Sequence, residues 1–220
     1  MSRKEKPASN ELELQQWVDS VFNKLMQLRH EDVARRCDVV YLKPKDAEPG
    51  GRFIVNLLNR TLTVELSNRE VLDLISGKNV GAKLSYVVVE YLARGDGSPI
   101  SGSWISLTKT IKSQELDNYF KKMVVRPFLQ TFGYDRELFE MAARMLGGRR
   151  EKLGGVSFSF LFLPKIRFLL QLWTGDKKEY TQPAANVSNS SNAFNYLSYP
   201  AIVYACETLV NMLKKSVDKI

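Results

Sequence analysis

The chain has 220 residues, of which 44% are hydrophobic and 25% are charged, as in ordinary soluble globular proteins. This composition excludes the disordered, collagen-like and membrane-embedded classes. There are 32 basic and 24 acidic side chains, which gives a formal net charge of +8. Residues 141–180 carry eight basic and three acidic side chains and hold most of the surplus. A basic surplus favours anionic partners where it gathers on one face.

Two cysteines, Cys37 and Cys206, are too few for a disulfide framework or for an iron–sulfur cluster, which takes about four thiolates. We therefore expect a reducing, cytoplasmic location and no iron–sulfur cluster. No apolar stretch separates the charges of residues 1–16, and the longest charge-free run, 180–206, has a polar centre. The sequence thus predicts neither a signal peptide nor a membrane anchor.

Residues 1–10 are expected to form a polar tail, and hydrophobic residues at helical spacing predict a long helix that is capped by Asn10. A break is expected at Pro127 in a later helix. The full set of expected helices covers residues 11–28, 67–77, 84–94, 113–125, 134–146 and 198–217.

Apolar and polar residues alternate in several short segments, which is typical of strands. One predicted hairpin turns at Asn59-Arg60, and residues 174–192 are expected to form a polar loop. The expected strands cover residues 39–42, 52–58, 61–66, 104–108, 156–162 and 166–173, with a turn at 163–165 between the last two.

The strongest strand pattern lies at 156–173, where one face of the predicted hairpin is purely apolar. Its other face mixes serines and leucines with Arg167, Gln171 and Trp173, so we expect that face to be half-solvated or to line a shallow cleft.

The order of these elements lacks the regular strand–helix alternation of parallel proteins. It predicts the α+β class, with an antiparallel sheet flanked by helices and with long N-terminal and C-terminal helices. We expect residues 11–220 to form a single domain, and a small N-terminal lobe that ends near residue 78 is the alternative.

A set of motifs in a fixed order resembles a known prokaryotic family, the domain of unknown function DUF3786. These motifs are Pro99-Ile100-Ser101-Gly102-Ser103-Trp104, Phe132-Gly133, Leu146-Gly147-Gly148-Arg149, Leu163-Pro164-Lys165-Ile166 and Leu172-Trp173-Thr174-Gly175-Asp176. The resemblance covers roughly residues 33–217 and implies one coherent domain without implying an activity. The acidic residues that follow the last motif in the family are replaced here, because Lys177 and Lys178 stand after Asp176.

The sequence gives little support for a catalytic site or a metal site. A metal site would require His30, Cys37 and Cys206 to converge, but the first two are seven residues apart and Cys206 is expected on a buried helix face. We therefore predict no metal site. Nucleophilic catalysis lacks a paired base because the chain has one histidine.

The basic loop 147–155 would suit a phosphate or carboxylate, but it lacks the lysine and hydroxyl spacing of a P-loop, and a helix end followed by a strand is the simpler interpretation. Nucleic-acid binding is disfavoured as well. The alternating Phe158, Phe160 and Phe162 fit core packing better than base stacking.

Trp104 and Trp173 stand at strand ends beside glycine-containing turns, where an indole ring can line a ligand pocket at the edge of a sheet. Arg149, Arg167 and Asp176 are the polar side chains expected near them. We predict these five residues as ligand-binding, and burial of both tryptophans in the core is the alternative.

The absence of a catalytic pair predicts a binding or accessory domain for a small anionic ligand or a protein partner. The alternative is an enzyme that uses Asp176 or Asp96 with nearby arginines. The sequence does not specify the reaction of such an enzyme or any cofactor.

Overall fold

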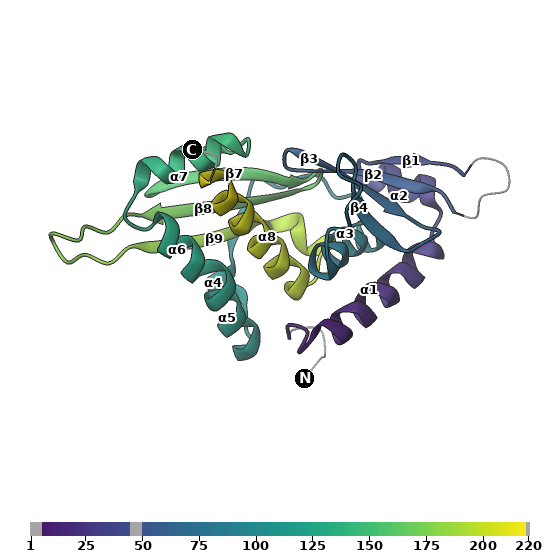
Figure 1. The fold of residues 1–220 in the computed structure, drawn as a ribbon, viewed down its shortest axis with the longest axis horizontal. Coiled ribbons are helices and arrows are strands. Elements are labelled where there is room, and N and C mark those ends of the chain that lie inside the picture. The colour runs from purple at the N-terminus through teal and green to yellow at the C-terminus, as the bar shows by residue number, and fades with distance from the viewer. Residues whose placement is uncertain (1–5, 45–49, 219–220) are drawn as a thin grey trace.

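The computed structural model describes residues 6–44 and 50–218 and contains two antiparallel sheets with helices packed against them (Figure 1). The predicted α+β class is confirmed. The helices are α1 (Glu11–Met26), α2 (His30–Cys37), α3 (Ala82–Arg94), α4 (Leu107–Thr110), α5 (Gln114–Phe120), α6 (Arg126–Phe132), α7 (Arg136–Met145) and α8 (Tyr199–Val217). The strands are β1 (Val40–Leu42), β2 (Arg52–Leu57), β3 (Arg60–Glu65), β4 (Glu70–Asp73), β5 (Trp104–Ser106), β6 (Arg149–Arg150), β7 (Val156–Leu163), β8 (Ile166–Trp173) and β9 (Ala184–Ser190).

The N-terminal half forms a four-stranded sheet in the order β1-β2-β3-β4, next to α1, α2 and α3. The β2–β3 hairpin is present, but it turns at Leu58 and Asn59, one residue earlier than predicted. The backbone N–H of Leu58 donates to the carbonyl of Phe162 in β7 at 3.1 Å. This hydrogen bond joins the turn of the first sheet to the second sheet.

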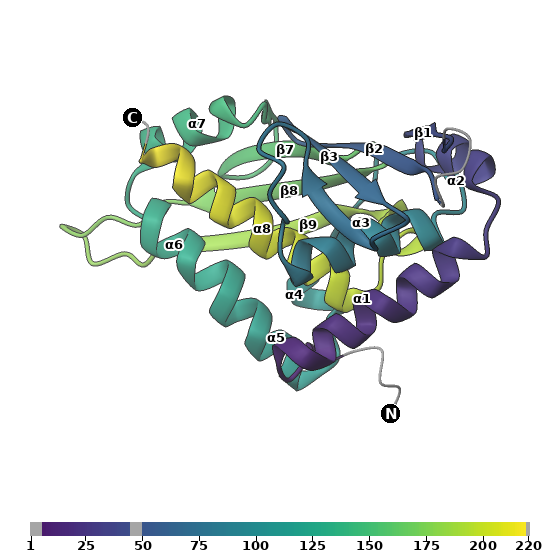
Figure 2. The ribbon, with the colours of Figure 1, turned by 45° about the vertical axis from the view of Figure 1, so that its right-hand side comes forward.

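The C-terminal half forms a five-stranded sheet in the order β5-β9-β8-β7-β6. Ile166, Phe168, Leu170 and Leu172 alternate along β8 and are fully buried, as the apolar face of the pattern predicts. Helix α8 crosses in front of β7, β8 and β9 (Figure 2). Its apolar stripe covers the core face of this sheet, while the opposite face carries the polar residues of the strands.

Several segments differ from the prediction: helix α2 was not predicted, and helix α4 begins at Leu107, inside the strand expected over residues 104–108. Residues 67–77 contain strand β4 instead of a helix, because Val71 and Asp73 point inward and pair with β3 while Ile75 is 92% exposed. Residues 184–190 form the inner strand β9 instead of a loop. Its asparagines and serines favour loops, but hydrogen-bonded ladders to both β5 and β8 hold it in the sheet.

Pro127 does not break its helix. A π-helical turn, η2 (Lys121–Val125), connects α5 to α6, and the N–H of Arg126 donates to the carbonyl of Lys121, five residues earlier. This wider turn accommodates a proline without ending the helix. A short 3₁₀ helix, η3 (Ser191–Asn195), leads from β9 toward α8.

None of the helices in residues 6–44 and 50–218 has both the length and the apolar composition that a membrane span requires.

Gly95 lies at the end of α3 at a point where three segments meet in the core. A Cβ atom there would lie 2.5 Å from Sγ of Cys37 and 2.9 Å from two ring carbons of Tyr196. The Tyr196 ring is stacked on Tyr91, with ring centroids 5.2 Å apart, so it has little room to move.

We expect Gly95→Ala to lower the free energy of unfolding by about 1–3 kcal/mol through overpacking, measured by urea denaturation. Gly102→Ala is the matched control, because nothing lies within 4 Å of its added Cβ atom. That control should change stability by no more than about 1 kcal/mol. Equal losses in the two variants would contradict this account of the core.

Candidate ligand-binding site

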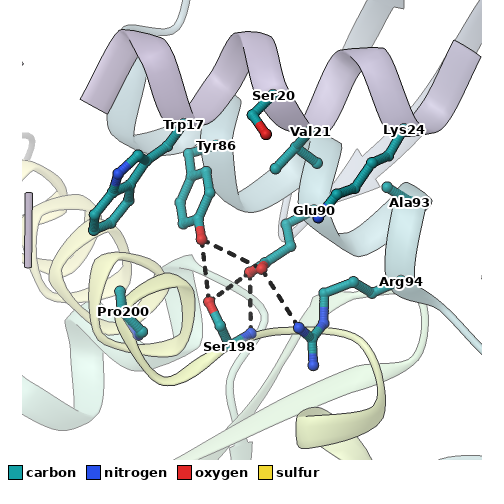
Figure 3. Close-up of a pocket in the computed structure, with 10 residues that line it drawn as sticks. All are labelled: Trp17, Ser20, Val21, Lys24, Tyr86, Glu90, Ala93, Arg94, Ser198 and Pro200. Atoms are coloured by element: carbon teal, nitrogen blue, oxygen red, sulfur yellow. Dashed lines mark hydrogen bonds and ion pairs between the residues drawn. The ribbon is translucent and has the colours of Figure 1, made fainter. Parts of the chain in front are cut away.

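A pocket of about 230 Å³ lies between α1, α3 and the start of α8 (Figure 3). We call it the three-helix pocket. Its volume is below the roughly 300–1,000 Å³ of pockets for drug-sized ligands, so it suits a smaller molecule. The lining residues are Trp17, Ser20, Val21 and Lys24 from α1, Tyr86, Glu90, Ala93 and Arg94 from α3, and Ser198 and Pro200 from the start of α8.

Helical periodicity explains why the lining residues meet. Trp17, Val21 and Lys24 follow one another at intervals of four and three residues, which places them on one side of α1. Tyr86, Glu90 and Arg94 recur every four residues along α3. Because α1 and α3 pack along their lengths, the two stripes face each other. Ser198, the N-cap residue of α8, closes one end of the pocket.

The carboxylate of Glu90 is the polar centre of the pocket. One of its oxygens accepts the backbone N–H of Ser198 at 3.0 Å and the hydroxyl of the same residue at 2.8 Å. The other accepts the Tyr86 hydroxyl at 3.3 Å and lies 3.9 Å from a guanidinium nitrogen of Arg94. Figure 3 shows these three side chains converging on the carboxylate. Glu90 therefore links α3 to the positive end of the α8 dipole.

Burial changes the acid–base behaviour of this centre. Glu90 is only 5% exposed, and desolvation raises the pKa of its carboxyl above the ordinary value of 4.5, against the hydrogen bonds from Ser198. Burial, followed by the charge of Glu90, also raises the pKa of Tyr86. The Tyr86 phenol therefore keeps its proton at neutral pH and donates a hydrogen bond to Glu90.

The rim of the pocket carries more positive than negative charge. Lys24 and Arg94 are both exposed at the surface, whereas Glu90 is the acidic side chain of the lining. Within the part of the chain that the structure describes, the Lys24 ammonium has no ion-pair partner, and Arg94 pairs with Glu90 alone. One positive charge is thus left over for a ligand.

The opposite wall of the pocket is apolar. The Trp17 ring lies next to the Tyr86 ring, with centroids 5.5 Å apart, and Val21 and Pro200 are buried beside them. An apolar wall with a few convergent polar groups is typical of a small-molecule binding site.

The residues predicted from the sequence lie elsewhere, on the five-stranded sheet. Strand pairing puts Trp104, Arg149, Arg167 and Trp173 on the same face, the one turned away from α8. Trp104 and Arg167 are in contact, because the guanidinium carbon lies 5.5 Å from the centre of the indole ring. Trp173 stands at the end of β8 and is 43% exposed.

Asp176, the fifth predicted residue, lies in the loop beyond the end of β8. Its carboxylate accepts the backbone N–H of Lys178 at 2.7 Å and that of Glu179 at 3.3 Å, so it stabilises a turn. Asp96, the other candidate acid, accepts the N–H of Ser98. Hydrogen bonds from the side chain and backbone of Ser98 lower the pKa of Asp96, which suits a charged turn residue.

The sequence reading missed the three-helix pocket. Trp17 and Val21 appeared only as part of the apolar stripe of the first helix. Glu90 was the available signal, because it is a charged residue in the otherwise uncharged run 84–93 of a buried helix. Such a residue is fully buried only when it has specific partners.

The residues considered as metal ligands are distributed over the fold. His30 Nδ1 lies 3.2 Å from the Tyr41 hydroxyl, whereas Cys37 and Cys206 are buried. Burial raises the pKa of Cys37 to about 12 and that of Cys206 as well, so both thiols stay protonated at neutral pH. Residues 6–44 and 50–218 hold no group of three or more His, Cys, Asp or Glu side chains placed to bind a metal.

A family model matches residues 29–212, and its description is Domain of unknown function (DUF3786). No curated protein and no solved structure matches the chain. Because the family match covers well over half of the 220 residues, the chain belongs to the DUF3786 family.

Proposed function

We propose that this protein is a binding domain that holds a small organic anion in the three-helix pocket. The observation that carries the proposal is the pairing of an apolar wall, Trp17 with Val21 and Pro200, with the two cationic side chains Lys24 and Arg94. An anionic group would contact the cations, and the apolar body of the ligand would lie against the indole ring.

The interior of the pocket supports this arrangement. Glu90 is fully engaged by Tyr86, Ser198 and Arg94, so it holds the Arg94 guanidinium in place and orients the start of α8. Its role is to position these groups. The hydroxyl of Ser20, which is exposed on α1, adds a hydrogen-bonding group at the pocket mouth.

The packing also supports the proposal that residues 11–220 form one domain. Helices α1 and α3 pack together although residue 78 lies between them in the chain. The hydrogen bond from Leu58 to Phe162 connects the two sheets directly. A separate lobe that ends near residue 78 would not be expected to share such contacts with the remainder of the chain.

The charge preference of the pocket can be tested with three probes of similar size, benzoate, benzyl alcohol and benzylamine, by isothermal titration calorimetry. We expect benzoate to bind most tightly and benzylamine most weakly, because the lining carries a surplus positive charge. Lys24→Met should weaken benzoate binding about fivefold, the order expected for one partly exposed charge contact.

Lys122→Met is the matched control, because Lys122 is exposed on η2 and does not line the pocket. It removes the same charge and should leave benzoate binding unchanged. The proposal is wrong if benzylamine binds as well as benzoate, or if both lysine variants weaken benzoate binding equally.

Glu90 should make stability depend on pH. Its pKa is higher in the folded chain than its ordinary value of 4.5, so the folded state binds the additional proton. The free energy of unfolding contributed by this group is therefore greatest below pH 4.5 and falls as the pH rises through the folded pKa. Glu90→Gln removes this dependence. We expect the stability of Glu90→Gln relative to the wild type to be higher at pH 8 than at pH 5 in urea denaturation.

Ser198→Ala should change the pH dependence of stability in the direction opposite to Glu90→Gln. Removal of the hydroxyl donor destabilises the charged carboxylate, so this variant should lose more stability at pH 8 than at pH 5. In the double variant with Glu90→Gln, the loss should no longer depend on pH. Identical pH profiles for the wild type and Glu90→Gln would rule out this role of Glu90.

A further inference from the structure

The face of the five-stranded sheet that points away from α8 carries an ordered array of polar and aromatic side chains. We call it the open sheet face and define it by Trp104, Arg149, Arg167, Gln171, Trp173 and Asn186, with the serines between them. We propose that this face binds single-stranded nucleic acid, with the tryptophans stacking on bases and with Arg149 contacting phosphates. This face is separate from the three-helix pocket, so each proposal can be correct or wrong without affecting the other.

Strand register fixes how the side chains are arranged. Trp104 of β5 is paired with Ser190 of β9, which lies beside Arg167 of β8. Trp173 comes six residues after Arg167 on the same strand, about 20 Å further along at roughly 3.3 Å per residue. The two indole rings therefore stand near opposite ends of the face. A span of this length matches an oligonucleotide of about four or more nucleotides.

Between the tryptophans, amide and hydroxyl groups form a chain of hydrogen bonds across the sheet. Asn186 donates to Gln171 at 2.8 Å and accepts from Ser106 at 2.7 Å, and Gln171 donates to the carbonyl of Gly154 at 3.3 Å. Gln171 and Asn186 are partly exposed. Asn186 uses both of its N–H donors, toward Gln171 and Ser188, so the second N–H of Gln171 and the remaining lone pairs of the two amide oxygens are the groups left for the edges of unpaired bases.

Serines and Leu169 form the buried floor of the face, and larger polar and aromatic residues form its surface. Ser157, Ser159, Ser188 and Ser190 are at most 3% exposed, whereas Arg149 is exposed and Trp173 is 43% exposed. The Trp173 ring also lies near Gly154, whose added Cβ atom would be 3.4 Å from it. The aromatic and cationic groups are thus anchored and yet accessible to a partner.

The charge of the face favours an anionic polymer. Strands β6, β7 and β8 come from residues 141–180, the segment with eight basic and three acidic side chains. The Arg167 guanidinium is neutralised by Glu151 at 3.2 Å, and Arg149 has no ion-pair partner within residues 6–44 and 50–218. Exposed Lys152 follows in the connecting loop. Arg149 and Lys152 are therefore the cations available to phosphate groups.

An acidic peptide is the competing occupant. Extended peptides commonly bind by adding a strand to a sheet edge, where backbone groups are free. Here the functional groups lie on the face, and two of them are aromatic rings suited to stacking. The phenylalanines that argued against base stacking, Phe158, Phe160 and Phe162, are indeed in the core, so that argument does not extend to Trp104 and Trp173.

The test measures fluorescence anisotropy of a labelled oligothymidylate of twelve nucleotides with the full chain at low salt. We expect saturable binding that weakens as salt is raised. Trp173→Ala should weaken it about tenfold through loss of stacking. Arg149→Ala should weaken it several-fold and make the salt dependence shallower, since one phosphate contact is lost. Both positions are exposed, so these variants should fold.

Three controls distinguish binding at the open sheet face from general attraction to positive charge and from binding of an acidic peptide. Lys122→Met and Lys78→Met remove a positive charge from exposed positions elsewhere and should leave oligothymidylate binding unchanged. A labelled oligoglutamate peptide of the same length should bind more weakly than the oligonucleotide. The proposal is overturned if oligothymidylate does not bind, if the lysine variants weaken binding as much as Arg149→Ala, or if oligoglutamate binds more tightly.

Discussion

The packing of α3 against α8 is the contact on which the rest of the structure depends. α3 belongs to the half built around the four-stranded sheet, and α8 covers the core face of the five-stranded sheet. Glu90 connects them through a buried carboxylate that accepts two hydrogen bonds from Ser198. A buried charge is tolerated only when it is satisfied, so this link fixes the relative position of the two helices. The three-helix pocket is the space left beside that link.

The elements that could be predicted from the sequence are those whose hydrophobic period is long and unbroken. Helix α8 and the β7–β8 hairpin each repeat their period over several turns or residue pairs, so local physics determines them. Strands β4 and β9 lack such a repeated period. Their residues favour loops or helices, and only pairing with neighbouring strands makes them extended. Pro127 was misjudged for a related reason, since the π-helical turn before it relieves the expected clash.

The two candidate sites also differ in how far the sequence predicts them. Trp104, Arg149, Arg167 and Trp173 could be chosen from residue type and strand position, but their placement on one face depends on the register between β5, β9 and β8. The three-helix pocket could not be found, because its residues come from three distant parts of the sequence. Each part alone looks like an ordinary amphipathic helix, and only their packing turns Lys24 and Arg94 toward a common space.

The two surfaces use the basic surplus of the chain in different ways. In the three-helix pocket, the buried Glu90 offsets one of two exposed cations, so a small anion meets about one net positive charge and its binding depends only weakly on salt. On the open sheet face, the cations lie at the surface and their attraction for a polyanion depends on counterion release. Binding of a small anion should therefore tolerate salt concentrations that dissociate a polymer. This difference follows from the number of charges that each ligand neutralises, and it separates the two surfaces physically even though both carry positive charge.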